Sequence, residues 1–446
     1  MKKVITYGSF DLFHEGHYNL LKRAKALGDY LIVGITTEQY DETRGKLNVV
    51  NSLIERIDNV RSSGFVDEII IEDHAGQKLE DIQKYGIDIF TVGSDWVGAF
   101  DYLKPYCEVV YLERTKNVSS TALRAKGRSV INVGVIGTGR IAKRFVPEVR
   151  AVSGITVHTV YNPHIESAKA YAEKFELEQY TDDLEKLFSS VDAIYVASPH
   201  ETHYEYVKAA LEHGKHVLCE KPLAFKKSEA KELYALADKK GLVLLEAIKT
   251  AYCPGFAQLV SIAKSGAIGE IRDVEATFTK LMPEHVREMT DLEYGGSFTE
   301  LASYNLLPIL KLMGTNYKKV RFDSIKAENG LDIYTKVNFI YEDGFAMAKT
   351  GLGVKSEGSL IISGTNGYIL SKSPWWLTES FEVRYEDPNK VEKHFTKFLG
   401  DGLRYEISDF AYMIQGHQGR THKLTHEESI AMAGVMEKFL KERNKK

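Results

Sequence analysis

The chain has 446 residues, of which 43% are hydrophobic and 27% charged, so it is long enough for two or three globular domains. Its formal net charge is -4, and Lys and Arg are spread along the sequence instead of standing in blocks. This pattern argues against a nucleic-acid or membrane-surface binder, so we expect small-molecule ligands.

The cysteines and the first residues bear on the cellular compartment. Cys107, Cys219 and Cys253 are far apart and lack metal-ligand spacing, so neither disulfides nor a zinc site is expected. Met1-Lys2-Lys3 leads directly into a strand-like run, and no stretch reaches the roughly 18 apolar residues of a membrane helix. A cytoplasmic protein without a protein-held metal is predicted.

Short apolar runs alternate with helical patterns twice along the first 250 residues, which predicts two successive parallel α/β sheets. The expected strands lie near residues 2–8, 29–35, 66–71, 88–93 and 107–113, then near 131–137, 156–162, 193–198, 216–220 and 242–247. Longer alternating strands follow, such as VEATFTKL and YTKVNFIYE, and predict an α+β domain with a large, open, mostly antiparallel sheet. The expected domains are 1–128, 129–250 and 251–446.

The segment GSFDLFHEGH stands between the first predicted strand and a helix expected over residues 18–27. Gly8 and Gly16 allow the backbone to approach a phosphate, which a helix N-terminus favours. His14 and His17 can reach one phosphoryl group and stabilise its charge during in-line displacement. Two ordinary loop histidines are the alternative, which the Gly-x-Phe-Asp sequence containing Phe10 and Asp11 disfavours.

Residues 1–126 resemble the cytidylyltransferase branch of the nucleotidylyltransferase family, above all glycerol-3-phosphate cytidylyltransferases. The motifs are GSFDLFHEGH, the RGK of residues 44–46, Glu55-Arg56, GSDWVGAFDYL, and Arg114-Thr115 followed by Ser119, Ser120 and Thr121. The resemblance implies that His14 and His17 act at the α-phosphate of CTP, that Lys46 contacts phosphates, and that Arg114 with residues 119–121 grips the triphosphate. Glu55 and Ser94 depart from the family pattern, which leaves the acceptor open.

A second phosphate-binding motif lies in VINVGVIGTGRIAKRF, where Gly137 and Gly139 precede a helix expected to open with Arg140 and Ile141. This strand-turn-helix pattern is the dinucleotide fingerprint of a classical Rossmann domain. The next strand ends at Asn162, where a ribose-reading residue belongs. Because Asn162 carries no charge to repel a 2′-phosphate, NAD and NADP both stay open, with a slight preference for NADP.

Residues 131–440 resemble the glucose-fructose oxidoreductase, inositol dehydrogenase and MocA family. The resemblance rests on AIYVASPHETHYEYVKAALEHGKHVLCEKPLA, GGSFTELASYNLLPIL, SGTNGYI and GLRYEISDFAYMI. It implies that Ala197, Ser198, Pro199 and His200 line the nicotinamide, that Glu220 and Lys221 form the family's Glu-Lys-Pro motif at the cofactor, and that Tyr304 stands where the family places a catalytic tyrosine or histidine. Glu300 stands one helical turn before Tyr304, so both should share a helix face.

Hydride transfer to a carbonyl carbon requires an acid that protonates the oxygen. Lys221 and Tyr304 are both suitable donors, and the sequence leaves the choice open. Lys249 follows a strand expected to end over the cofactor, and Lys280, His285 and Arg287 form a cationic cluster. A phosphate on the substrate would explain these charges, and solvated loop residues are the alternative.

The two sites together predict a bifunctional enzyme. One module would reduce a keto-sugar phosphate with NADPH or NADH, and the other would convert the resulting polyol phosphate with CTP and Mg²⁺ into a CDP-alditol, the metal being held mainly by the nucleotide. In the families resembled, such products feed bacterial cell-surface polysaccharides. The alternative is a cytidylyltransferase whose oxidoreductase domain is non-catalytic or has an unrelated substrate. A homo-oligomer without nucleic-acid or membrane partners is expected.

Overall fold

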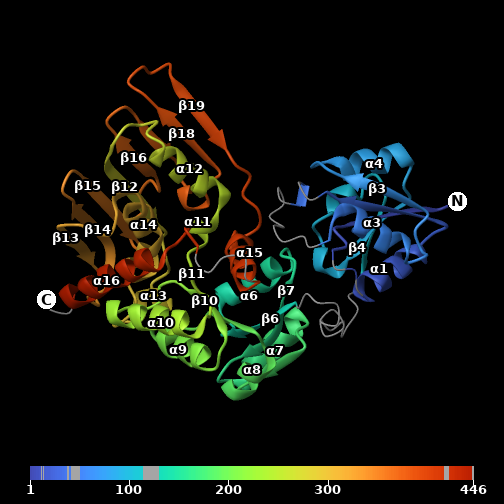
Figure 1. The fold of residues 1–446 in the computed structure, drawn as a ribbon, viewed down its shortest axis with the longest axis horizontal. Helices are drawn as coiled ribbons and strands as arrows, with labels where there is room; N and C mark the ends of the chain where they lie inside the picture. The colour runs from blue at the N-terminus through green and yellow to red at the C-terminus, as the bar shows by residue number, and fades with distance from the viewer. Residues whose placement is uncertain are drawn as a thin grey trace.

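The structure, a computed structural model, describes residues 1–11, 13, 15–37, 40–41, 51–113, 130–415 and 421–443. Within these ranges the strands form three sheets, each with its own helices (Figure 1). The first two sheets are parallel and the third is large and mostly antiparallel. This arrangement confirms the predicted fold class.

The first sheet has the order β3-β2-β1-β4-β5 and is parallel throughout. Its strands are β1 (Lys3–Gly8), β2 (Tyr30–Thr36), β3 (Glu68–Glu72), β4 (Ile89–Gly93) and β5 (Glu108–Leu112), and its helices include α1 (Glu15–Lys25), α3 (Leu53–Arg61) and α4 (Gln77–Tyr85). Successive side chains of a strand point to opposite faces, so β1 contributes Val4 to one hydrophobic cluster and Ile5 to another.

The second sheet has the order β11-β10-β9-β6-β7-β8 and is also parallel. Its strands are β6 (Ile131–Ile136), β7 (Ile155–Tyr161), β8 (Gln179–Thr181), β9 (Ala193–Val196), β10 (His216–Glu220) and β11 (Leu244–Ala247). Its helices are α6 (Arg140–Val149), α7 (Ile165–Phe175), α8 (Leu184–Ser190), α9 (His203–Glu212) and α10 (Lys227–Lys240).

The third sheet has the order β13-β14-β15-β12-β16-β17-β18-β19. Its strands are β12 (Ile271–Thr279), β13 (Lys319–Lys326), β14 (Asp332–Ile340), β15 (Phe345–Gly351), β16 (Leu360–Gly364), β17 (Tyr368–Ser371), β18 (Ser380–Arg384) and β19 (Val391–Phe395). The pairing is antiparallel except between β12 and β15, which are parallel. Helix α14 (Ser297–Met313) packs along β12, β14 and β15.

Helices α11 (Lys249–Tyr252) and α12 (Pro254–Lys264) connect the second sheet to the third, α13 (Arg287–Thr290) follows β12, and α15 (Leu403–Ile414) and α16 (His426–Arg443) follow the last strand. The chain returns at its end to the second sheet, where α15 packs on α6 and α16 packs on α10. An ion pair of 2.7 Å between Arg404 and Glu148 fixes the first of these contacts. One hydrophobic cluster includes residues of both sheets, for example Tyr195 of β9 and Val274 of β12, so these two units share a core.

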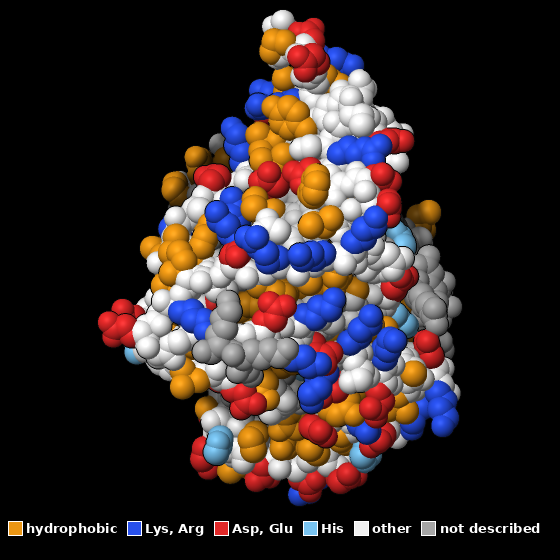
Figure 2. All heavy atoms as spheres, turned by 90° about the vertical axis from the view of Figure 1, so that its left-hand side faces the viewer, with side chains coloured by type: hydrophobic (Ala, Val, Ile, Leu, Met, Phe, Trp, Pro, Cys, Tyr) orange, Lys and Arg blue, Asp and Glu red, His pale blue; other side chains and the backbone are white. Residues whose placement is uncertain are grey.

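Charged side chains of both signs lie interspersed on the face that Figure 2 shows. In the described part of the chain, no helix is both long and apolar enough to cross a membrane. Over the same residues, no three His, Cys, Asp or Glu side chains gather as metal ligands would.

Candidate functional sites

The carboxyl end of the first sheet carries the loop that joins β1 to α1. Phe10 is buried and adopts a left-handed backbone conformation, with φ of 51°. The ring of His17, in the first turn of α1, has its centroid 5.4 Å from that of Phe10 and 5.6 Å from that of Phe13. Asp11 accepts a hydrogen bond of 2.8 Å from the backbone N–H of Asn51. The loop therefore holds His17 at a helix N-terminus, where an anion is favoured.

Arg56, in α3, is fully buried and connects three segments at this end of the sheet. Its guanidinium donates to the carbonyl oxygens of Ser9 at 2.9 Å, Thr36 at 2.7 Å and Asn51 at 3.0 Å. It also lies 3.7 Å from the Asp41 carboxylate. A buried cation is tolerated only when it is paired and hydrogen-bonded, and here these bonds brace the loop after β1.

The structure describes only part of the predicted first site. Its residues at the end of β1 and in the first turn of α1 are Gly8, Phe10, Asp11, Gly16 and His17. Those outside the described residues are His14, Lys46, Arg114, Ser119, Ser120 and Thr121. Glu55 forms a capping box with Ser52 at the start of α3, so this departure from the family pattern has a local structural role.

The second sheet has the turn that a dinucleotide requires. Gly137 has φ of 106°, and a Cβ atom there would lie 2.6 Å from the Ala197 carbonyl oxygen. Gly139 has an ordinary φ of -72°, and a Cβ atom there would meet no protein atom within 4 Å. The first glycine thus allows the chain to pass close to β9, while the second leaves open space at the N-terminus of α6. These features fit a nicotinamide dinucleotide, whose pyrophosphate binds at such a helix start.

Asn162 and Arg140, both at the predicted dinucleotide site, form hydrogen bonds or ion pairs with other residues of the protein. The Asn162 side chain donates 3.0 Å to the Thr138 hydroxyl and accepts 2.9 Å from the His164 backbone N–H. Arg140 forms an ion pair with Glu288 of α13. Ile141, the next residue, packs against the main core. Asn162 therefore braces the glycine loop, a role that its position in the sequence did not indicate.

The segment after β9 carries Ser198, Pro199 and His200. The ring nitrogens of His203 lie 3.0 Å from the Ser198 carbonyl oxygen and 2.8 Å from that of Pro222, so His203 ties this segment to the Glu-Lys-Pro motif. Burial lowers the pKa of His200 well below its usual range, and the charge of Lys221 lowers it further. The imidazole of His200 is therefore neutral near pH 7.

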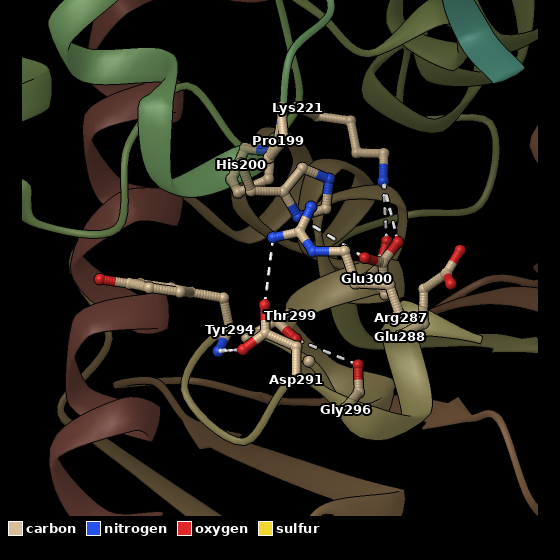
Figure 3. Close-up of polar contacts among 12 residues, drawn as sticks. Pro199, His200, Lys221, Arg287, Glu288, Asp291, Tyr294, Gly296, Thr299 and Glu300 are labelled. Carbon is tan, nitrogen blue, oxygen red and sulfur yellow. Dashed lines mark hydrogen bonds and ion pairs between the residues drawn. The ribbon is translucent and has the colours of Figure 1, made fainter. Parts of the chain in front are cut away.

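Lys221 and α14 form the centre of this second site, and Figure 3 shows the Lys221 side chain extending toward Glu300. Lys221 Nζ donates 2.9 Å to the Glu300 carbonyl oxygen and lies 3.9 Å from Glu300 Oε2. His200 Nδ1 lies 3.6 Å from Glu300 Oε1, and Lys221 Nζ lies 5.8 Å from the centroid of the Tyr304 ring. Glu300 and Tyr304 thus lie on the helix face that meets Lys221, as predicted. Burial raises the pKa of Tyr304, and Glu220 raises it further, so the hydroxyl keeps its proton.

Glu220, expected at the cofactor, turns its side chain toward the core. Its side chain is buried and accepts a hydrogen bond of 2.6 Å from the Tyr195 hydroxyl. Burial raises the pKa of this carboxyl group, and the charge of Lys221 opposes the shift. Glu220 therefore lies beneath the site and supports it from the core, and it is not among the residues that line the adjoining cavity.

A cavity of about 670 Å³ opens beside Lys221. Five residues that the sequence analysis singled out line this cavity: Lys221, Lys249, Lys280, Glu300 and Tyr304. The other lining residues, which the sequence did not indicate, are Arg144, Phe278, Thr279, Leu281, Leu301, Lys355, Ser373 and Trp376. Phe278 stacks on Trp376 with centroids 3.7 Å apart, and the Tyr304 ring lies 5.2 Å from Phe278. The cavity thus has an aromatic wall next to the candidate proton donors.

The cationic cluster expected from the loop after β12 does not gather in one place. Lys280 lines the cavity, whereas His285 is exposed. Arg287 forms ion pairs with Glu201 and with Asp291, the latter at 3.1 Å (Figure 3). Arg287 therefore joins this loop to the segment after β9. Lys280, His285 and Arg287 do not form the single phosphate-binding cluster that was expected.

Comparison with known proteins identifies the first module. Residues 5–126 match the family described as cytidylyltransferase-like. The glycerol-3-phosphate cytidylyltransferase of Bacillus spizizenii is 51% identical over 124 residues, which are 28% of this chain and 95% of the relative.

The rest of the chain has a second set of relatives. Residues 131–247 match the oxidoreductase family with an NAD-binding Rossmann fold. The scyllo-inositol 2-dehydrogenase (NADP(+)) of Bacillus subtilis is 28% identical over 323 residues, 70% of this chain and 97% of the relative. A 3-ketoreductase from Actinomadura kijaniata, solved with NADP and TDP-benzene, has a TM-score of 0.59 at 24% identity and covers 69% of this chain and 95% of its own. That structural likeness shows the fold alone. The chain therefore belongs to the cytidylyltransferase family through its first module, and this module is followed by a domain that matches the NAD-binding oxidoreductase family, so that cytidylyltransferase and NAD(P)-dependent oxidoreductase domains stand in one chain.

Proposed function

We propose that the two modules catalyse consecutive reactions. The oxidoreductase reduces a keto-sugar phosphate, taking a hydride from NADPH or NADH and a proton, and yields a polyol phosphate. The transferase then joins the phosphate of this product to the α-phosphate of CTP, and yields a CDP-alditol and pyrophosphate. Products of the CDP-ribitol or CDP-glycerol type suit the synthesis of cell-surface polysaccharides.

The charge of the cavity beside Lys221 carries this proposal. Five cationic side chains line it, against the single carboxylate of Glu300: Arg144, Lys221, Lys249, Lys280 and Lys355. A phosphate monoester carries about two negative charges near neutral pH and matches such a wall, whereas an uncharged sugar does not need it. The transferase relative is named for glycerol 3-phosphate, a polyol phosphate, so the product of one module would have the chemistry of the other's acceptor.

The residues around the cavity suit proton delivery to a carbonyl oxygen. A bound nicotinamide cofactor would supply the hydride, and NADP is favoured because the name of the Bacillus subtilis relative includes it. We assign the proton to Lys221 Nζ or to the Tyr304 hydroxyl, since both residues line this space. Glu300 would orient Lys221, because its carbonyl oxygen accepts one of the ammonium N–H bonds. In the transferase module, His14 and His17 would stabilise the transferring phosphoryl group, with Mg²⁺ bound to CTP.

A coupled assay tests the proposal. The enzyme is incubated with NADPH or NADH, CTP, Mg²⁺ and a panel of ketose phosphates that includes ribulose 5-phosphate and dihydroxyacetone phosphate. Cofactor oxidation and pyrophosphate release are followed together. We expect one ketose phosphate to give both signals, with pyrophosphate appearing only after reduction.

Two variants separate the modules in this assay. Lys221→Met should abolish cofactor oxidation but retain pyrophosphate release from a preformed polyol phosphate, and His17→Ala should do the reverse. If CTP is consumed with preformed polyol phosphates but no ketose phosphate oxidises the cofactor, the alternative holds: a transferase with a non-catalytic or unrelated oxidoreductase domain. The retained Lys221 and the glycine turn at residues 137–139 support the active form. A homo-oligomeric assembly is also part of this proposal.

A further inference from the structure

Two lysines lie together on the side of the cavity that the third sheet forms. Lys280 follows β12, and its backbone N–H donates 2.8 Å to the Gly351 carbonyl oxygen at the end of β15. Lys355 belongs to the loop after β15, and its ammonium group donates 2.9 Å to the Thr279 carbonyl oxygen. Thr279 immediately precedes Lys280, so both lysines are attached to the same strand end.

This strand end is well fixed. The Thr279 hydroxyl accepts a hydrogen bond from the Ser356 backbone N–H and donates one to the Ser356 carbonyl oxygen, each at 3.0 Å. The two bonds fasten the loop that carries Lys355 to the strand that precedes Lys280. The pair of ammonium groups is therefore presented by a braced backbone, which lowers the entropy cost of binding an anion.

Within the part of the chain that the structure describes, carboxylates of the protein do not balance the charges of this pair. Lys221 has Glu300, and Arg144 Nε lies 3.9 Å from Asp401 Oδ2. Lys249 donates 2.7 Å to the Asp401 carbonyl oxygen. Among the described residues, no ion pair to a carboxylate is formed by Lys280 or Lys355. An anionic ligand would supply the missing counter-charge.

We propose that Lys280 and Lys355 bind the phosphate group of the oxidoreductase substrate, an inference that rests on the proposed function. The carbonyl carbon lies at Lys221 and Tyr304, and the carbon chain between carbonyl and phosphate packs on the stacked rings of Phe278 and Trp376. The substrate class is thus a keto sugar whose phosphate is remote from the carbonyl. Lys249, which the sequence suggested for this role, instead contacts Asp401, as Arg144 does.

Substitution of the pair tests the assignment. Lys280→Ala, Lys355→Ala and the double variant are compared with Lys336→Ala, an exposed lysine of β14 that does not line the cavity. The measurement is kcat/KM of NADPH oxidation with the ketose phosphate selected by the panel and with the same ketose lacking phosphate. The ratio of the two values should fall at least tenfold in each single variant, mainly through KM, and should not change in Lys336→Ala. If Lys249→Ala lowers the ratio and the pair does not, the assignment is overturned.

Inorganic phosphate provides a test that does not need turnover. It should raise the Tm of the oxidoreductase domain in the wild-type chain and in Lys336→Ala. This increase should be lost in the double variant that lacks Lys280 and Lys355. An equal increase in the double variant would contradict the assignment even if a ketose phosphate is reduced. If phosphate raises the Tm only when Lys280 and Lys355 are present but no phosphorylated ketose is reduced, the anion site is supported and the proposed reduction is refuted.

Discussion

Alanine at Gly137 and alanine at Gly139 should damage the oxidoreductase in two different ways. At Gly137 the new Cβ atom would lie 2.6 Å from the carbonyl oxygen and 2.9 Å from the carbonyl carbon of Ala197, on a backbone with φ of 106°. At Gly139 the same atom would meet no protein atom within 4 Å, and φ is an ordinary -72°. Alanine at position 137 would clash with the protein backbone, whereas alanine at position 139 would clash only with a bound pyrophosphate.

The magnitudes follow from these contacts. For Gly137→Ala, a positive φ costs roughly 1–2 kcal/mol, and overlap with backbone that cannot rotate away costs roughly 1–3 kcal/mol more. A total of about 2–5 kcal/mol corresponds to a fall in Tm of about 4–20 °C for a unit of this size. For Gly139→Ala we expect a Tm equal to that of the wild type or slightly higher, since alanine reduces the entropy of the unfolded chain.

Scanning calorimetry and a titration with NADPH, followed by nicotinamide fluorescence, measure both effects. We expect Gly137→Ala to lower Tm and Gly139→Ala to raise the Kd for NADPH tenfold or more at unchanged Tm. Pyrophosphate release from CTP and a polyol phosphate is the internal control, because the transferase module should keep its activity in both variants. If Gly139→Ala binds NADPH normally, the open space at the start of α6 is not the pyrophosphate site.

Three further predictions concern single residues. Tyr304→Phe should lower kcat for cofactor oxidation by roughly 10²-fold or more if its hydroxyl delivers the proton, whereas a loss below tenfold in steady-state assays would assign the proton to Lys221. Burial raises the pKa of Glu246 to about 7, above the value of roughly 4.3 in the unfolded chain. The folded state therefore holds this proton more tightly, and stability falls as the pH rises between these two values. Glu246→Gln should reduce the fall in Tm that is measured from pH 4 to pH 8. Arg56→Met should destabilise the transferase module by about 3–5 kcal/mol in urea unfolding, with cofactor oxidation unchanged, and a stable variant would show that the bonds from Arg56 to Ser9 and Thr36 are dispensable.

Local patterns in the sequence were enough to predict the sheets and the glycine turn. Apolar runs that alternate with helical periodicity indicated both parallel sheets, and the strand-turn-helix context indicated the close approach at Gly137. The helical spacing of Glu300 and Tyr304 gave their common face. The parallel pairing of β12 with β15 was not predictable in this way, because side chains alternate with a period of two in both kinds of sheet.

Residue motifs were less informative about which way a side chain points. Glu220 and Lys221 are adjacent in a recognised motif, but successive residues of an extended chain point to opposite faces. One side chain therefore enters the core beside Tyr195, and the other reaches the cavity. The domain boundaries and the roles of the individual site residues stay predictions.

The sequence indicated only part of the charge of the cavity, because four segments besides the one that carries Lys221 contribute to it. Arg144 comes from α6, Lys249 from α11, Lys280 from the end of β12 and Lys355 from a loop more than 70 residues later, and only the packing of the third sheet against the second brings them to one space. Like charges around a partly desolvated cavity repel each other, so this arrangement reduces stability in the absence of an anion. Proteins retain such destabilising groups where function requires them, and a bound anion that neutralises the lysines would restore the lost stability. Under the proposed function, an anionic substrate therefore accounts for the excess of cations beside Lys221, which the needs of folding do not.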